Sequence, residues 1–225
     1  STVPLPKSPH LVSFRKTLLE EFEEKPFWNK KLEYLSYEFL LWPNVFHSFI
    51  SIWNEVLDFK QTGFTHYLEF FHFVREPQCD FADWIFPHDK LSFASYTEAI
   101  VRAAMLSKKE AVRIMFDKFS QGPYKGDEGI SVESWEALVD LTLSVENLSF
   151  ARRLAVEAFG QFASKNMEGV LVLHFDDFER IVKSYPFLTQ PFLRFLEALR
   201  KMHLGEKYWR RKKQEMATVH AKIKK

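Results

Sequence analysis

The sequence predicts an all-helical protein with a large core, and two observations support this prediction. Only 7 of the 225 residues are Gly, and apolar residues recur at helical spacing over long stretches. Hydrophobic residues make up 46% of the chain and aromatic residues 16%, which excludes intrinsic disorder over most of its length. The single cysteine, Cys79, excludes an internal disulfide framework and a cysteine-based zinc cluster.

Residues 1–44 are predicted to form an extended arm followed by two helices. Early prolines indicate the arm, and the apolar spacing predicts an amphipathic helix over residues 10–24. Pro26 suits the first turn of a second helix. We expect this second helix to run to about Trp42 and to end or kink at Pro43, because proline disrupts a helix interior.

After residue 44 the pattern changes to four repeats, in which an aromatic-bearing helix, a polar loop and a second helix follow one another. The clearest loop has twelve residues and runs from Asp58 to Glu69. Asp58, Gly63 and Glu69 fall at its first, sixth and twelfth positions. A calcium loop needs an oxygen ligand at the first position, a sharp turn at the sixth and a bidentate carboxylate at the twelfth.

On this spacing the chain resembles the EF-hand superfamily, in particular four-hand proteins of the calmodulin, recoverin and calcineurin-B type. The resemblance implies two pairs of helix–loop–helix units, over residues 45–106 and 107–186. It also implies short β contacts at the eighth loop positions, where the expected pairs are Thr65 with Leu91 and Ile130 with Val170. An unrelated helical bundle is the alternative, and the absence of these contacts would support it.

The resemblance implies one remnant metal site, in the first loop. Its ligands would be Asp58, Thr62, Glu69 and the backbone carbonyl of Phe64. Lys60 places an ammonium group where a carboxylate should bind, so we expect this site to be unoccupied. The other loops cannot supply several carboxylates at matching positions, and the fourth has Ala163, Lys165, Met167 and His174 there. The sequence therefore predicts no cofactor, with calcium in the first loop as the alternative.

Residues 187–225 are predicted to form a terminal helix and a basic tail. The helical pattern continues to about His203, and Gly205 suits a C-terminal cap. From Lys201 to Lys225 the net charge is +7, whereas the rest of the chain carries −6. The tail residues expected to bind a partner are Trp209, Arg210, Arg211, Lys212 and Lys213. Candidate partners are an acidic protein, an anionic membrane surface and, least favoured, nucleic acid; a merely solvated helix end is the alternative.

No enzyme signature is present in the sequence. The histidines are scattered without a zinc-binding spacing, and neither a nucleophile elbow nor a phosphate-binding glycine loop occurs. No run of about 18 uncharged apolar residues exists, so we expect no transmembrane segment, while peripheral membrane contact stays open.

The expected function is that of a non-catalytic accessory subunit, which holds partner helices in Phe- and Trp-rich grooves of a degenerate EF-hand scaffold. A calcium-regulated adaptor that binds one ion in the first loop is the alternative. An intracellular location is expected. If Ser1 is a processed terminus, a mitochondrial complex, such as a respiratory one, is favoured over a cytosolic, cytoskeletal or axonemal one.

Overall fold

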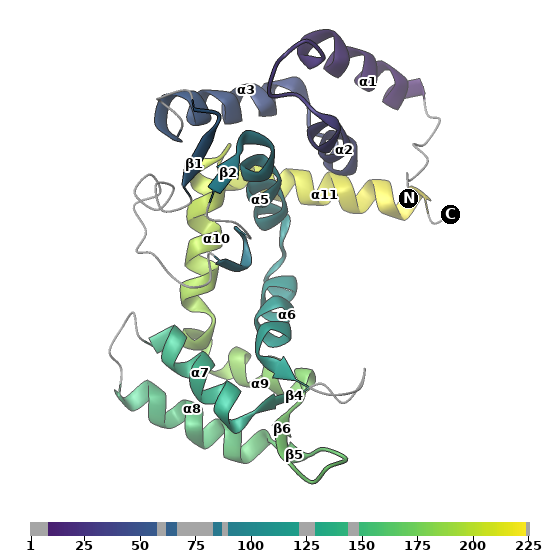
Figure 1. The fold of residues 1–225 in the computed structure, drawn as a ribbon. Helices are drawn as coiled ribbons and strands as arrows, with labels where there is room; N and C mark the ends of the chain where they lie inside the picture. The colour runs from purple at the N-terminus through teal and green to yellow at the C-terminus, as the bar shows by residue number, and fades with distance from the viewer. Residues whose placement is uncertain are drawn as a thin grey trace. The chain divides into compact units, whose positions relative to one another are not determined.

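The computed structural model is mostly helical, with a few short antiparallel strands (Figure 1). It describes residues 9–57, 62–66, 83–86, 90–121, 129–143 and 149–223. The chain divides into two compact units. Unit 1 combines Ser1–Met105 with Glu197–Lys225, and unit 2 is Leu106–Leu196. The C-terminal segment thus belongs to the same unit as the N-terminal half of the chain.

Unit 1 begins with three helices, α1 (Pro9–Phe22), α2 (Lys30–Phe39) and α3 (Pro43–Ile52). The second is shorter than the predicted span from Pro26 to Trp42. It starts late because the side chain of Asn29 accepts hydrogen bonds from the first backbone amides of α2. It ends at Leu40, whose φ of 50° is left-handed. Pro43 is the first residue of α3 instead of a helix terminator, since a helix needs no backbone donor there.

The centre of unit 1 holds a two-stranded ladder that leads into a long helix. Strand β1 (Phe64–His66) pairs antiparallel with β2 (Lys90–Ser92), and Thr65 lies opposite Leu91, which confirms that predicted pair. Helix α5 (Phe93–Met105) follows β2 directly. A single π-helical turn, η1 (Trp53–Leu57), continues α3 towards the first loop.

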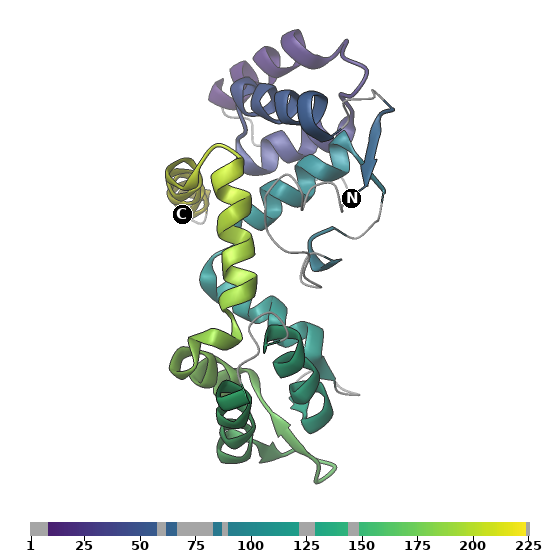
Figure 2. The same cartoon turned by 90° about the vertical axis from the view of Figure 1, so that its left-hand side faces the viewer.

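The C-terminal segment of unit 1 consists of two helices and is described up to Ile223. Helix α10 (Gln190–Met202) enters from unit 2, and α11 (Glu206–Ile223) turns sharply away from it (Figure 2). Gly205 makes this corner with a φ of +82°, and its N–H donates to the carbonyl of Arg200 at 2.9 Å, which confirms it as a helix cap. The predicted basic tail is therefore a regular helix of 18 residues.

A buried polar cluster joins α5, α10 and α11 inside unit 1. His203 Nδ1 donates to the carbonyl of Leu199 at 2.8 Å, so Nε2 is left to accept from the Tyr96 hydroxyl at 2.5 Å. The indole N–H of Trp209 donates to the carbonyl of His203, and Phe49 stacks on the imidazole at 5.3 Å. Burial lowers the pKa of His203 to about 4 and raises the pKa of Tyr96, so both side chains are neutral at pH 7.

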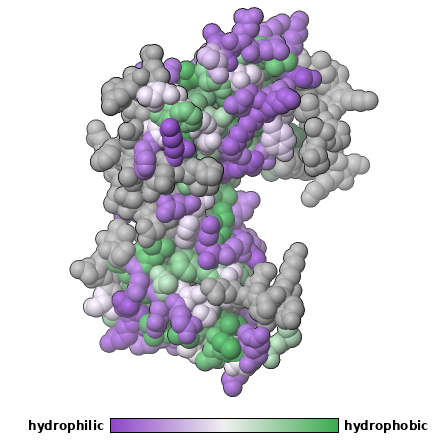
Figure 3. Space-filling model, in the orientation of Figure 1, coloured by the Kyte–Doolittle hydropathy of each residue, from purple (hydrophilic) through white to green (hydrophobic). Residues whose placement is uncertain are grey.

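In the described part of the chain, no helix is long and apolar enough to cross a bilayer. Helix α1, for example, is amphipathic. The surface at the top of Figure 3, where α1 lies, is largely hydrophilic, and Lys16 and Glu20 of this helix are exposed. Its other side buries Phe14, Leu18 and Phe22 in the core of unit 1.

Unit 2 is a contiguous segment with its own helices and sheet. The helices are α6 (Lys108–Phe119), α7 (Val132–Leu143), α8 (Ser149–Phe162) and α9 (Phe175–Ser184), with a 3₁₀ turn η3 (Pro186–Leu188) before α10. The strands are β3 (Ser120–Gln121), β4 (Gly129–Ser131), β5 (Ser164–Lys165) and β6 (Leu171–Leu173), in the spatial order β3-β4-β6-β5. Gly129 is required where β4 meets β6, because a Cβ there would lie 2.7 Å from Cβ of Val172.

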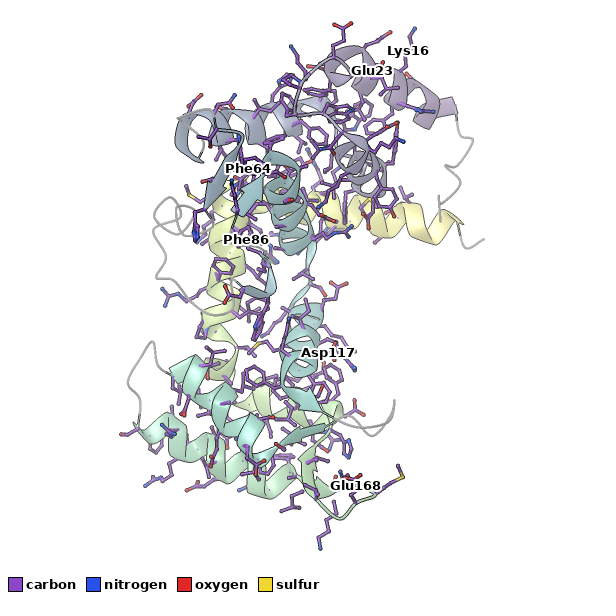
Figure 4. The ribbon with its side chains drawn as sticks, viewed as in Figure 1. Lys16, Glu23, Phe64, Phe86, Asp117 and Glu168 are labelled. Atoms are coloured by element: carbon purple, nitrogen blue, oxygen red, sulfur yellow. The ribbon has the colours of Figure 1, made fainter. Side chains whose placement is uncertain are left out.

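The central pair of this sheet has a different register from the predicted one. Ile130 lies opposite Leu173, so the prediction that Val170 is its partner was wrong by three residues. The shift arises because the chain folds β5 and β6 into a hairpin closed by Asn166. Its side-chain oxygen accepts from the amide of Val170 at 2.9 Å and from that of Glu168 at 3.1 Å. Figure 4 labels Glu168 on this turn, which Gly169 completes with a φ of +79°.

Candidate functional site

The observed strand register aligns all four loops on one sequence pattern. Each has a strand residue, a polar residue after it and an aromatic residue five positions on. The strand residues are Thr65, Leu91, Ile130 and Leu173, and the matching aromatics are Phe70, Tyr96, Trp135 and Phe178. The three aromatics that the structure describes are at most 1% exposed. In the three repeats whose aromatic is described, the loop strand is therefore coupled to a core aromatic on the helix that follows.

In all three described repeats, the polar residue that follows the named strand residue lies at the start of the next helix. Ser92 and Ser131 each accept a hydrogen bond from the amide three residues on, at 3.3 Å in both cases. In the fourth repeat this position is His174, the N-cap of α9. His174 was expected at the twelfth loop position. With Leu173 as the strand residue, Asp177 takes the twelfth position instead. Its carboxylate pairs with Arg180 at 3.1 Å.

The first loop can be examined only at its centre, because Asp58, Lys60 and Glu69 lie outside the described residues. Gly63 has a φ of +78°, as the sharp turn of a calcium loop requires. The Thr62 hydroxyl donates to the Phe64 carbonyl at 2.8 Å, so two predicted ligands are bonded to each other.

Positive charge lies beside this part of the loop. The ammonium group of Lys90, on the paired strand, lies 4.4 Å from the centre of the Phe64 ring. Within the described ranges, no three His, Cys, Asp or Glu side chains converge as a metal site. The described residues of the loop thus have a glycine turn at the expected position and a lysine ammonium group beside it.

A pocket of about 750 Å³ lies next to this loop in unit 1. Its wall is mainly apolar and aromatic, and its polar groups are uncharged. The lining residues are Pro26, Phe27, Asn29, Ile50, Trp53, Asn54, Thr62, Gly63, Ser92, Phe93 and Ala94. The Phe93 ring packs edge-on against Phe27 at 5.1 Å and against Trp53 at 5.7 Å, so the aromatic wall is fixed. The volume lies within the range found for ligand-binding pockets.

The sequence did not predict this pocket. Three of its lining residues, Pro26, Phe27 and Asn29, come from the irregular segment before α2, which the prediction had placed inside a helix. Asn29 followed by two lysines and an apolar residue is an N-cap signal that could have revealed the later helix start. With that start, Phe27 becomes a loop residue free to contact α5.

Two of the five predicted partner-binding residues lie in the core of unit 1. Trp209 is 0% exposed and belongs to the polar cluster around His203. Lys212 is 4% exposed, and its ammonium group donates to the carbonyl of Leu40 at 2.9 Å, at the end of α2, and pairs with Glu215 at 2.8 Å. Both positions face inward because helix α11 places them three residues apart on one side.

The other three predicted residues are accessible to different degrees. Arg210 and Arg211 are exposed, and Lys213 is half-buried. Accordingly, the surface available to a partner is formed by the outer side of α11 and not by the whole basic run.

Comparison with known proteins found no matching family model, no matching curated protein and no matching solved structure. Functional inference for this chain therefore depends on the geometry of the described residues.

Proposed function

We propose that this protein is a non-catalytic accessory subunit, in which a degenerate EF-hand scaffold binds a helix of a partner protein. The observation that carries the proposal is the strand register. Loop strands pair two by two, Thr65 with Leu91 and Ile130 with Leu173, and the three strands whose following residues the structure describes lead into helices with a buried aromatic. A calmodulin-like or recoverin-like arrangement requires this pairing of loop strands. Thr65, the eighth residue of the first loop, takes part in it as the resemblance to an EF-hand implies.

The pocket in unit 1 is the proposed docking position for the partner helix. Binding of an amphipathic helix in an apolar groove is a recurrent use of helical scaffolds, with bulky side chains at helical spacing as anchors. Phe27 and Ile50 are half-buried in the pocket lining and can contact such anchors, and the neutral polar groups can bond to the helix backbone. The assembly that supplies this helix is proposed to be a larger complex, with a mitochondrial respiratory complex as the favoured setting.

A calcium-regulated adaptor is the second candidate, because Gly63 keeps the backbone turn of a working loop. Asp58, Thr62, Phe64 and Glu69 would then hold one ion. Lys60 and Lys90 oppose this candidate, since both bring positive charge to the loop.

Calorimetric titration of the full chain with calcium separates the two candidates. A structural scaffold gives no binding heat in the wild type or in Glu69→Gln. Micromolar binding that disappears in Glu69→Gln would overturn the calcium-independent scaffold and establish a one-site sensor.

Titration of a Leu-rich amphipathic helical peptide tests the pocket itself. Ile50→Asp puts a carboxylate into the apolar wall, and we expect the affinity to fall about tenfold or more. The matched control is Ile52→Asp, which makes the same change on the same helix at a half-buried residue outside the pocket lining. Equal loss in both variants, or no peptide binding at all, would argue against the pocket as the docking position.

A further inference from the structure

The outer side of α11 carries a stripe of positive charge. Lys207, Arg210 and Arg211 are exposed there, while Trp209 and Met216 on the opposite side are buried in unit 1. Because the buried side fixes the rotation of the helix, the three cations point to solvent. Spacings of three and four residues place Lys207 directly above both arginines on the helix surface. We name Lys207, Arg210 and Arg211 the α11 stripe.

The α11 stripe has no acidic counterpart among the described residues. None of its three side chains takes part in a hydrogen bond or ion pair in the described part of unit 1. The two acidic residues of α11 are engaged elsewhere, Glu206 with Arg200 at 3.7 Å and Glu215 with Lys212 at 2.8 Å. The ion pairs of these two carboxylates therefore go to Arg200 and Lys212, and neither goes to the α11 stripe.

This arrangement is locally unfavourable for the helix. Like charges three and four residues apart repel each other, and cations near a helix N-terminus oppose the helix dipole. Both effects destabilise α11 in the free protein. A negative partner would offset both, so the stripe is better explained by binding than by stability.

We propose that the α11 stripe binds an acidic segment of a partner protein. The stripe is one helix wide and, continued by Gln214, about 10 Å long, which matches a single chain segment bearing several carboxylates. Arginines suit this partner because a guanidinium group can bond a carboxylate through two N–H groups. An anionic bilayer fits less well, because the other described exposed residues on this side, Gln214, Ala217 and Thr218, include no bulky apolar side chain to enter the membrane.

This surface goes beyond the proposed function, because it is a second docking surface that shares no residue with the pocket. It is also independent of the calcium loop. If the α11 stripe does not bind an acidic peptide, the pocket experiment is unaffected. Conversely, the Ile50→Asp variant should bind an acidic peptide as the wild type does.

The test is fluorescence anisotropy of a labelled oligoglutamate peptide with the full chain at low salt. The variant Lys207→Gln/Arg210→Gln/Arg211→Gln is expected to bind about tenfold or more weakly. The matched control is Lys108→Gln/Lys109→Gln/Lys118→Gln in α6, which removes the same charge from three exposed lysines, two of them at a helix N-terminus. We expect the control to bind within about twofold of the wild type, and binding to weaken as salt rises.

The triple variant should fold at least as well as the wild type, since it removes repulsion, and thermal unfolding checks this. Absence of peptide binding, or equal loss in the α6 control, would overturn the proposal. Stronger binding to phosphatidylserine vesicles or to an oligonucleotide than to the peptide would also overturn it, and would identify a lipid or nucleic-acid partner instead. A single Arg210→Gln change, with an expected loss of about threefold, keeps the test valid if the triple variant aggregates.

Discussion

Unit 1 and unit 2 pair their loop strands in the same register but stabilise the result in different ways. In unit 2, the outer strands β3 and β5 extend the ladder to four strands, and Trp135 bonds to the carbonyl of Ala155 at 3.0 Å within the same contiguous segment. In unit 1, the described ladder has two strands, and Tyr96 bonds to His203, which lies 107 residues away in sequence. The same strand-to-aromatic spacing is thus supported by contacts within one contiguous segment in unit 2 and by a long-range polar cluster in unit 1.

The largest effect should come from removing the unit 2 aromatic. Trp135→Ala is expected to lower the free energy of unfolding by about 3–5 kcal/mol, because it leaves a cavity and removes the hydrogen bond from the indole to the Ala155 carbonyl. Urea denaturation measures this loss. Phe150→Ala is the control in the same unit, since Phe150 is 62% exposed, and it should change stability by no more than about 0.5 kcal/mol. Similar losses in both variants would mean that Trp135 does not anchor the core.

The second effect is a pH dependence that belongs to unit 1. The pKa of His203 is about 4 in the folded protein and about 6.5 in an unfolded chain. The unfolded state therefore takes up the proton first as the pH falls. The free energy of unfolding therefore has its full contribution from neutral His203 above pH 6.5. It loses this contribution, about 3 kcal/mol in total, as the pH falls towards 4.

Unfolding free energies of wild type and His203→Phe over this pH range provide the measurement. His203→Phe should lack this part of the decline, while effects of surface carboxylates remain in both proteins. Parallel curves for the two proteins would contradict a buried neutral His203.

A third effect should distinguish two lysines on the same helix. Lys212→Met removes the ammonium group that donates a hydrogen bond to the Leu40 carbonyl at the end of α2. The free energy of unfolding should therefore fall by about 2 kcal/mol. Lys207→Met, on the exposed side, should change it by no more than about 0.5 kcal/mol. Thermal unfolding of the two variants compares them, and a larger loss for Lys207→Met would reverse the assignment of inner and outer sides.

The smallest effects should have opposite signs at two glycines of unit 2. Gly169→Ala forces a side chain into a left-handed turn with a φ of +79° and should cost about 1 kcal/mol. Gly160→Ala lies in helix α8 with no atom within 4 Å of the new Cβ, so it should stabilise by about 0.5–1 kcal/mol. Denaturation midpoints at equal slopes report both changes. A stabilising Gly169→Ala would mean that the β5–β6 turn is not needed.

Much of the helical layout could be predicted from sequence because it depends on local patterns. The helix expected over residues 10–24 and the cap at Gly205 follow from spacing within a short stretch, whereas the pairing of Thr65 with Leu91 was implied by the resemblance to EF-hand loops. The partner of Ile130 could not be predicted in this way. The Asn166 turn adds residues to the loop, and a side chain that bonds its own loop leaves no periodic signal.

The candidate surfaces were less predictable than the helices. Lys212 is a charged residue in a basic run, and sequence alone gives no reason to bury it. Its burial depends on the carbonyl of Leu40, which lies 172 residues away. Likewise, the pocket depends on Phe27 meeting Phe93, a contact between distant segments. Of the predicted calcium ligands, only Thr62 and Phe64 fall among the described residues, so the full ligand set stays a prediction.

The return of the chain to unit 1 has a consequence for biosynthesis. Unit 2 is encoded without interruption, so all of its residues are available once Leu196 has left the ribosome. Unit 1 cannot close its core until Trp209 and Lys212 emerge, long after its first helices have been made. Until then, Phe49 and Tyr96 lack their C-terminal packing partners, and a ribosome stalled before residue 200 would present an unfinished unit 1 to chaperones and proteases.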